Sequence, residues 1–364
     1  MQKEKVFAIV MAGGKGERFW PQSRVSHPKQ LLRLIGNLTL IEQTVERLLP
    51  LVLPENIIII SNEDYVAPMR SLLSNIPAAN IIGEPVGRDT APCIALAAAV
   101  VRARGKNDDA VMMFLPADHV IKEKELLLKS LSAGINAAAS GKVVTIGVDP
   151  SFPSTGYGYI HCGKKLDIKS DIEFFESVGF KEKPDLETAV KFLEEGCYKW
   201  NSGMFIWSCS TLVQALKQFT PSLFEAMQEI EKSITGGTFE KTLKEIYPSL
   251  SKISIDYAIM EKISNVIVEK CTFDWDDVGS WTALRNQIKA REHNNVVRGL
   301  HEGLGTEDCI VVSDASHLIA TVDVKDLIIV HTEDATLVCN AKSAQKIKEL
   351  VQQLSMKPEL SRFL

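Results

Sequence analysis

The sequence predicts an α/β protein with a doubly wound, mixed but mostly parallel sheet, followed by a small β unit. Apolar segments of strand length alternate with helical patterns through the first half of the chain. Those apolar segments lack polar alternation, which is typical of strands covered on both faces of a sheet. After residue 294, short apolar segments recur at nine-residue intervals, which indicates a separate β unit.

Helix-start signals separate the strands of the first half. Thr39 followed by Glu42 is a capping box, so a helix is expected from there to about residue 49. Asp89 is placed to cap a second helix that ends near residue 104, and a third helix is expected at 123–139. The strands between them are expected at residues 6–11, 57–60, 81–82, 111–115 and 143–148.

The pattern changes twice along the rest of the chain. Closely spaced strands around a helix near 186–195 are expected from residue 157 to 207, and helices from there to about 288. The terminal β unit is either a meander or the coils of a β-helix, and a helix near 344–354 follows it. We therefore expect two domains, residues 1–292 and 293–364. The strands of the β unit are expected at residues 309–312, 318–321, 327–330 and 336–339.

Composition excludes several classes of protein. Of the 364 residues 45% are hydrophobic and 24% are charged, and the net charge is -5, which argues against non-specific nucleic-acid binding. The seven cysteines are dispersed without paired spacing, as expected for reduced thiols in the cytoplasm. The longest apolar run, residues 91–101, is too short to span a membrane, and the N-terminus lacks the apolar core of a signal peptide.

The most informative motif is the glycine-rich stretch AGGKGER at residues 12–18, which follows the first strand. Such a loop directs backbone N–H groups at one point, and Arg18 and Lys29 add positive charge. The spacing is neither that of a Walker loop nor that of the dinucleotide fingerprint, where Phe19 replaces the third glycine. An ordinary strand-to-helix turn is the alternative, but the cations favour a phosphate site.

Asp118 lies at the carboxyl end of a buried strand, in the sequence LPADH. Ligands of open α/β sheets bind outside such strand ends, and Mg²⁺ prefers one or two carboxylates together with phosphate oxygens. The same carboxylate could merely cap the following helix. Asp118 is therefore a candidate metal ligand.

Three acids within four residues, in the sequence WDDVGSW and the residues just before it, are expected to repel one another without a cation or strong donors. Their density favours Asp277 as a second metal ligand beside Asp118. The alternative is that Asp277 caps a helix that starts near Ser280.

Two further stretches are candidate recognition loops. In GEPVGRDT, at residues 83–90, a carboxylate from Glu84 could accept the N1–H and N2–H of guanine, and a donor could meet its O6. A tight turn with a Glu84–Arg88 ion pair is the alternative there. The stretches GYGY and FKEKP form the second candidate loop region. Glu182 in FKEKP and Asn201 further along the chain offer hydrogen bonds to sugar hydroxyls, and Lys183 could bind a sugar phosphate. Taken singly, each of these is an ordinary surface turn.

Together these stretches resemble the sugar-1-phosphate nucleotidyltransferases, also called nucleotide-sugar pyrophosphorylases. The resemblance covers roughly residues 5–285 and rests on AGGKGERFWPQSR with HPKQ, GEPVGRDTAP, FLPADHVI, GYGYI, FKEKPD, WNSGMFIW and WDDVGSW, in this order. The forms GRDTAP, WNSGMF and WDDVGSW are similar to the mannose-1-phosphate guanylyltransferase branch. The C-terminal β unit resembles the short left-handed β-helix of compact family members.

The resemblance implies a Rossmann-like nucleotide-diphospho-sugar transferase fold and the reaction of mannose 1-phosphate with GTP to GDP-mannose and pyrophosphate. It also implies Mg²⁺ as cofactor, direct in-line attack and a homodimer, with neither nucleic acid nor membrane as partner. The catalytic residues it implies are Arg18, Lys29, Asp118, Lys183 and Asp277, with Mg²⁺ held by Asp118 and Asp277. The substrate-binding residues it implies are Ala12, Gly13, Gly14, Gly16, Glu84, Arg88, Thr90, Gly158, Glu182 and Asn201.

Three alternatives were weighed against this function. A guanylyltransferase for another sugar phosphate, such as a heptose or fucose, fits the same residues, because one sequence does not reveal hydroxyl stereochemistry. A non-catalytic GDP-mannose-binding regulatory subunit would lack the acids and cations that are present here. An NAD-dependent dehydrogenase would need a third glycine at position 19 and an acid at the end of the second strand, where the sequence has Ser61 and Asn62.

Overall fold

The computed structural model describes residues 3–105, 110–313 and 316–364 of the chain. They form two compact units, each assembled from separate parts of the sequence. The first unit contains residues 1–13, 45–117 and 121–275, and the second contains residues 14–44, 118–120 and 276–364. Helix α1 (Leu40–Leu48) runs across one of the divisions between them.

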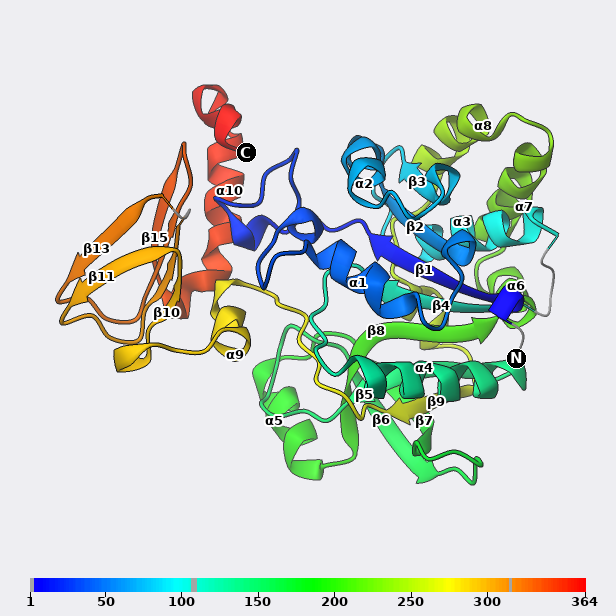
Figure 1. Cartoon of the computed structure of the whole chain (residues 1–364). Helices are drawn as coiled ribbons and strands as arrows, with labels where there is room; N and C mark the ends of the chain where they lie inside the picture. Colours follow the sequence, from blue (N-terminus) through cyan, green and yellow to red (C-terminus); the bar gives the residue numbers. More distant parts are fainter. Residues whose placement is uncertain (1–2, 106–109, 314–315) are drawn as a thin grey trace. The chain divides into compact units, whose positions relative to one another are not determined.

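The first unit is built on a mixed sheet with the strand order β3-β2-β1-β4-β8-β5-β9-β7-β6 (Figure 1). Strands β1, β2, β3 and β4 pair in parallel, whereas β8 is antiparallel to both β4 and β5. The predicted doubly wound, mixed α/β fold is confirmed. The strand bounds are β1 (Val6–Ala12), β2 (Ile57–Asn62), β3 (Ile81–Glu84), β4 (Val111–Pro116), β5 (Val143–Val148), β6 (Tyr159–Lys165), β7 (Phe174–Lys181), β8 (Tyr198–Ser208) and β9 (Val266–Lys270).

Helices cover both faces of this sheet. Because successive side chains of a strand point to opposite faces, Phe205 and Ile206 of β8 contact different layers. Phe205 belongs to one large buried cluster with the helices α3, α6, α7 and α8, whereas Ile206 lies beside Gly134 of α4. The helix bounds are α2 (Val66–Leu72), α3 (Thr90–Ala103), α4 (Lys124–Ala139), α5 (Leu186–Glu195), α6 (Cys209–Phe219), α7 (Pro221–Thr235) and α8 (Phe239–Ile246).

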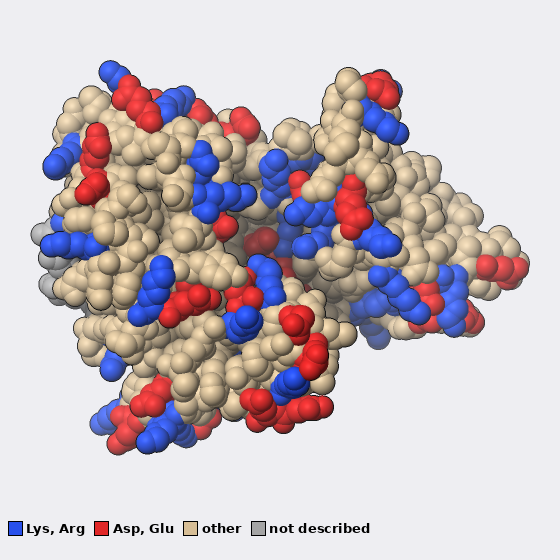
Figure 2. All heavy atoms as spheres, turned by 180° about the vertical axis from the view of Figure 1, so that it is seen from behind, with Lys and Arg blue, Asp and Glu red and all other residues tan. Residues whose placement is uncertain are grey.

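Charged side chains of both signs are interspersed on the surface. On the face drawn in Figure 2, the described Lys and Arg side chains alternate with Asp and Glu and form no continuous basic band. None of the helices in the described ranges has both the length and the apolar character that a membrane crossing requires.

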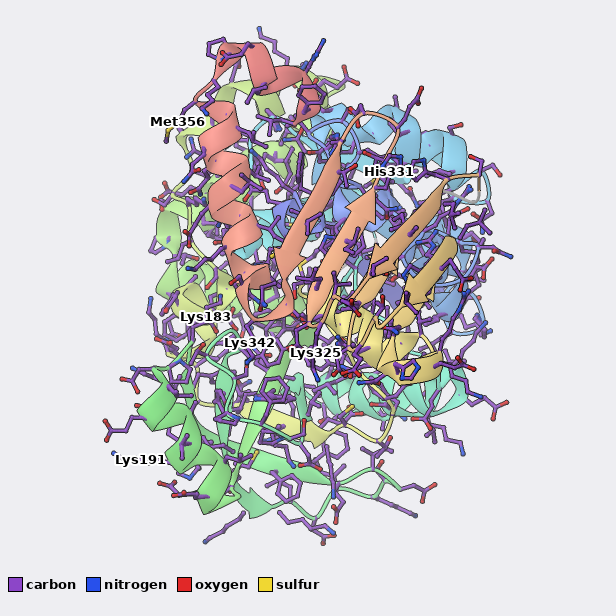
Figure 3. The ribbon with its side chains drawn as sticks, turned by 90° about the vertical axis from the view of Figure 1, so that its left-hand side faces the viewer. Lys183, Lys191, Lys325, His331, Lys342 and Met356 are labelled. Carbon is purple, nitrogen blue, oxygen red and sulfur yellow. The ribbon has the colours of Figure 1, made fainter. Side chains whose placement is uncertain are left out.

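The second unit contains a small β-helix-like element. Strands β10, β12 and β14 pair in parallel, and so do β11 and β13, whereas β15 returns antiparallel to β14 (Figure 3). Leu300 pairs with Leu318 and Ile310 with Ile328, so one coil contains two of the nine-residue intervals seen in the sequence. Because these strands pair in parallel, the unit consists of β-helix coils, and the alternative of a meander, whose strands pair antiparallel, is wrong. The bounds are α9 (Leu284–Gln287), β10 (Val296–Arg298), β11 (Leu300–Leu304), β12 (Ile310–Val312), β13 (Leu318–Val322), β14 (Leu327–His331), β15 (Thr336–Asn340) and α10 (Ile347–Ser355).

The second unit is not the same as the expected second domain, because it also contains residues from the expected first domain, 1–292, and not only residues 293–364. Phe19 and Val120, which precede residue 292, are buried in one cluster with Ile310 and Ile328 of the coils. The loop regions 14–44 and 118–120 therefore pack with the C-terminal strands, because their apolar side chains complete that cluster.

Candidate active site

The glycine-rich stretch follows β1 directly. The Ala12 carbonyl, in the first unit, accepts a 2.8 Å hydrogen bond from the Ser61 hydroxyl. A side chain at Gly13 would come within 3.6 Å of a carboxylate oxygen of Glu84, so only a small residue leaves that carboxylate accessible from the loop. Ala12, Gly13 and Glu84 are thus close together.

The remainder of the loop belongs to the second unit. Gly16 has a left-handed conformation with φ 68, and a Cβ atom at this position would overlap the Lys29 side chain. Arg18 lies in a short 3-10 helix (Glu17–Phe19) that is anchored by buried Phe19. Arg18 itself is exposed, and it has no ion-pair partner among the described residues. The loop therefore packs tightly against Lys29 at Gly16 and exposes a positive charge at Arg18.

Lys29 is the centre of a cluster in the second unit. Its ammonium group is buried, and it lies 2.8 Å from a carboxylate oxygen of Asp118 and 2.6 Å from the main-chain carbonyl of Asp277. The Phe19 ring covers it at 5.7 Å. We call Lys29, Asp118 and Asp277 the lysine cluster; the structure brings together three residues that are far apart in the sequence.

Asp118 is ionised more readily than an ordinary aspartate. Burial by itself would raise its pKa, but the charges of Lys29 and His119, with hydrogen bonds from Lys29 and the backbone, lower the pKa below the usual value. The capping alternative for Asp118 is wrong, because helix α4 starts at Lys124 with Glu123 at its N-cap. The carboxylate is thus a charged ligand group rather than a helix cap.

The three neighbouring acids have separate roles. Asp274 accepts hydrogen bonds from the backbone N–H groups of Lys122 and Glu123 at the start of α4, at 2.9 and 2.8 Å. Asp276 accepts from the Val278 N–H at 2.7 Å and from the Gln287 amide at 2.8 Å. Strong donors therefore stabilise the carboxylates of Asp274 and Asp276.

Asp277 lies at a sharp turn beside Asp276. The following residue, Val278, has a left-handed φ of 46, and a side chain at Gly279 would lie 3.2 Å from an Asp277 carboxylate oxygen. Ser280 is the N-cap of the following 3-10 helix (Trp281–Ala283), so Asp277 is not its cap and that alternative is wrong.

The lysine cluster fits a magnesium ion only in part. The Lys29 ammonium group contacts the Asp118 carboxylate and the main-chain carbonyl of Asp277, so one carboxylate and a second acidic residue lie around it. Mg²⁺ accepts one or two carboxylates when substrate phosphate and water complete the coordination. In the described ranges, no group of three or more His, Cys, Asp or Glu could hold a metal ion by itself. Substrate oxygens would therefore be part of any such site.

Glu84 of the first unit is buried and has a partner that was not foreseen. Its carboxylate accepts a short hydrogen bond from the Tyr247 hydroxyl, and burial raises its pKa to about 7. Arg88 donates a short hydrogen bond to the Pro248 carbonyl instead. Because the two residues have separate partners, the alternative of a Glu84–Arg88 ion pair is wrong.

Gly158, Glu182, Lys183 and Asn201 lie together in the first unit. The Glu182 carboxylate packs on Gly158 so closely that a Cβ atom would overlap it, and the same Cβ atom would lie 3.5 Å from Asn201. The Gly158 carbonyl accepts a 2.8 Å hydrogen bond from the Asn201 N–H, and Lys183 forms a 2.6 Å ion pair with Glu182. We call these four residues, together with Asp256, the asparagine cluster.

Asp256 is the member that sequence reasoning missed. Its carboxylate accepts a 2.8 Å hydrogen bond from the Asn201 amide. The residue before it, Ile255, donates its N–H to the Thr90 hydroxyl at 2.8 Å, so Thr90 at the start of α3 supports this segment. A lone acid within the apolar run ISIDYAIM was the available signal.

Comparison with known proteins shows the family of this chain. The family model described as nucleotidyl transferase matches residues 7–294, and the MannoseP isomerase/GMP-like beta-helix domain matches residues 299–354. The chain therefore belongs to the nucleotidyl transferase family. The resemblance predicted from the ordered motifs and the enzyme class are confirmed.

The particular relatives are named consistently. A mannose-1-phosphate guanylyltransferase from Escherichia coli (strain K12) is 37% identical over 358 residues, which is 97% of this chain and 74% of that protein. The mannose-1-phosphate guanylyltransferase ManC from Salmonella typhimurium has the same identity and coverage. A solved structure described as mannose-1-phosphate geranyltransferase from Thermus thermophilus matches with a TM-score of 0.86 and 36% identity, over 96% of this chain and 99% of that one.

Proposed function

We propose that this chain transfers the GMP group of GTP to α-D-mannose 1-phosphate, giving GDP-mannose and pyrophosphate. The observation that carries the substrate assignment is the 37% identity, over 97% of the chain, to relatives named mannose-1-phosphate guanylyltransferase. The nucleotidyl transferase family supplies the class of reaction, and the names of the relatives point to this pair of substrates.

The proposed step is a direct displacement. An oxygen of the sugar phosphate forms a bond to the α-phosphorus of GTP, while the bond from that phosphorus to the bridging oxygen breaks. The electron pair of the broken bond leaves with pyrophosphate, so no covalent enzyme intermediate forms. Positioning and neutralisation of charge then account for the catalysis.

In the second unit, the loop and the lysine cluster are assigned to the phosphates of GTP. The backbone N–H groups of Gly14 and Gly16 and the exposed Arg18 would bind the leaving pyrophosphate. Lys29 would neutralise charge near the attacked phosphorus, and its burial makes that interaction stronger than it would be in water.

Asp118 and Asp277 are the residues that would hold Mg²⁺. A bound Mg²⁺ ion would supply Lewis-acid polarisation of the phosphate oxygens. The ionised state of Asp118, maintained by Lys29 and His119 against burial, which alone would raise its pKa, suits a metal ligand.

In the first unit, the asparagine cluster is assigned to the sugar phosphate. Glu182, Asn201 and the backbone at Gly158 would bind sugar hydroxyls, while Lys183 would bind the phosphate group. Glu84 and Arg88 are assigned to the guanine base, since a buried carboxyl with a free oxygen suits the N–H edge of guanine. The nucleotide would also contact Ala12, Gly13 and Thr90.

The remaining assignments concern surroundings and partners. All seven cysteines are free, which supports a reducing compartment, and we propose the cytoplasm. The mixed surface charge in Figure 2 and the net charge of -5 support small molecules rather than nucleic acid as partners. A homodimer is proposed from the family resemblance.

A matrix of nucleoside triphosphates and sugar 1-phosphates tests the function by pyrophosphate release, with and without Mg²⁺. We expect GTP with mannose 1-phosphate to be preferred over each other pair by about tenfold or more in kcat/KM. Activity with UTP or dTTP but not with GTP would overturn the guanine assignment. Preference for a heptose or fucose 1-phosphate would replace mannose by that sugar.

The Asp118→Asn variant separates an enzyme from a non-catalytic binding subunit. It removes a proposed metal ligand but retains the shape of the side chain, so we expect the fold to persist and kcat to fall by about a hundredfold or more. The matched control is Asp64→Asn, on an exposed turn of the first unit that is capped by Asn62. Near-normal turnover of Asp118→Asn at limiting Mg²⁺ would contradict the metal assignment.

A further inference from the structure

Asp256 lies in an unusual helical segment of the first unit. Residues Asp256–Met260 form one turn of π-helix, and the apolar side chains Ile255, Ala258 and Ile259 are completely buried around it. Such turns are rare and often lie at functional sites. Asp256 is the acidic residue that this turn carries to the asparagine cluster.

The contacts of Asn201 show what Asp256 does there. The amide oxygen of Asn201 accepts hydrogen bonds from the Gly203 N–H at 3.1 Å and the Thr145 hydroxyl at 3.3 Å. Its amide nitrogen donates to Asp256 at 2.8 Å. An amide oxygen accepts two hydrogen bonds and an amide nitrogen donates two, so one N–H remains for a ligand. Asp256 holds one amide N–H, and the Gly203 N–H and the Thr145 hydroxyl hold the oxygen, so these contacts together determine which group Asn201 offers.

Asp256 also acts on Lys183 through its charge. Burial by itself would lower the pKa of Lys183, but the hydrogen bond and charge of Glu182, with the charges of Asp256 and Asp89, raise it. The charges of three carboxylates thus favour the charged form of Lys183. Burial, followed by the charge of Glu182, raises the pKa of Asp256 to about 6.

We infer that Asp256 is a positioning residue that sets sugar selectivity, because it fixes the orientation of the Asn201 amide so that one N–H points to the sugar. This inference rests on the proposed function. A carboxylate in this place excludes the flipped amide, whose oxygen would face Asp256 and repel it. A flipped Asn201 would present an acceptor instead of a donor, and it would bind a hydroxyl of another orientation.

The test measures selectivity between mannose 1-phosphate and its C2 epimer glucose 1-phosphate, with saturating GTP. We expect Asp256→Ala to raise the KM for mannose 1-phosphate by about tenfold and to lower the selectivity ratio similarly, while the KM for GTP changes by less than about twofold. Asp256→Asn retains an acceptor oxygen for the Asn201 amide, so it should restore most of the selectivity. The matched control Glu231→Ala removes a carboxylate that pairs with Arg102 at 2.9 Å elsewhere in the first unit.

A double-mutant cycle with Asn201→Ala distinguishes positioning from a general loss of structure. If Asp256 acts through Asn201, the double variant should bind mannose 1-phosphate no more weakly than Asn201→Ala alone. Additive effects, or an unchanged selectivity ratio in a folded Asp256→Ala variant, would overturn the inference. If Asp256→Ala does not fold, the same cycle is run with Asp256→Leu, which fills a similar volume without an acceptor for the Asn201 amide, and an additive result overturns the inference again.

The outcomes also separate this inference from the proposed function. A wild-type protein without activity on GTP and mannose 1-phosphate would refute the proposed function. An active wild type whose Asp256 variants keep its selectivity would refute only the role of Asp256.

Discussion

Gly16 and Gly36 have nearly the same backbone conformation in different surroundings. Both are left-handed, with φ 68 and 72, but a Cβ atom at Gly16 would overlap Lys29, whereas nothing lies within 4 Å of that position at Gly36. A non-glycine residue in this conformation costs roughly 1–2 kcal/mol by itself. Alanine substitutions at Gly36 and Gly16 therefore separate the free-energy cost of the left-handed backbone from the cost of displacing Lys29.

We expect Gly36→Ala to lose about 1 kcal/mol of unfolding free energy and to retain its activity. Gly16→Ala should lose more stability and also about tenfold or more in kcat/KM, because Lys29 must move away from Asp118. Urea unfolding and steady-state kinetics measure the two effects. Equal losses for both variants would show that the contact with Lys29 is unimportant.

Individual residues also mark the limit of prediction from sequence. The end of a strand indicated Asp118, and the positive charge after the glycine-rich loop indicated Lys29, but neither showed that one ammonium group would contact both Asp118 and Asp277. The partner of Glu84 is Tyr247, which lies 163 positions away. Spacing along the chain does not reveal such pairs, because they depend on which loops the fold brings together.

At the scale of elements, the buried strands of the first sheet were the most predictable. Continuous apolar runs located β1, β2, β4 and β5 closely, because strands covered on both faces need apolar side chains at every position. In the second unit, the nine-residue interval located β12 to β15 but not their pairing. Strand β9 (Val266–Lys270) was missed, because helices were expected from residue 207 to about 288. Strands β10 and β11 were also missed, since Val296–Arg298 is short and Leu300–Leu304 exposes most of its residues.

Strand β9 and helix α4 enclose a carboxyl group that the proposed mechanism does not use. Glu269 is completely buried, and one of its oxygens accepts a short hydrogen bond from Ser130. The other oxygen has no hydrogen-bond partner in the described part of the chain and lies where a side chain at Gly134 would be. Burial raises the pKa of Glu269 from 4.5 to about 8.

A raised pKa in the folded state means that protonation favours folding. The stabilisation from Glu269 is complete below pH 4.5 and is lost as the pH rises to about 8, at roughly 1.4 kcal/mol for each pH unit. Glu269→Gln does not titrate, so its stability relative to the wild type should increase over this range and then level off. Urea unfolding from pH 5 to about pH 9 measures the difference.

The control for Glu269 is Glu231→Gln, which changes a half-buried carboxylate that pairs with Arg102. It should show no comparable gain in relative stability with rising pH. A constant difference between Glu269→Gln and the wild type across the range would show that Glu269 is already ionised in the folded protein.

On the scale of the whole molecule, the family boundaries and the compact units divide the chain differently. The nucleotidyl transferase model ends at residue 294 and includes every residue assigned to the site. Yet Phe19, Trp20 and Leu34, around the glycine-rich loop, are buried in one cluster with the coils of the second unit. Trp20 also donates a 2.7 Å hydrogen bond to the Phe363 carbonyl. The β-helix-like element therefore completes the core that supports the glycine-rich loop.

A chain that ends at residue 294 tests this dependence. It would expose the apolar side chains of the loop to water, at roughly 1.5–3 kcal/mol for each large side chain. We expect faster amide hydrogen exchange in residues 14–34 and a loss of about tenfold or more in kcat/KM, while strand β4 of the first unit stays protected. The exposed substitution Leu318→Ser, on the outer face of β13, serves as the control and should change neither quantity. If the shortened chain kept full activity and loop protection, residues 7–294 would be self-sufficient, and the β-helix-like element would not be needed to support the loop.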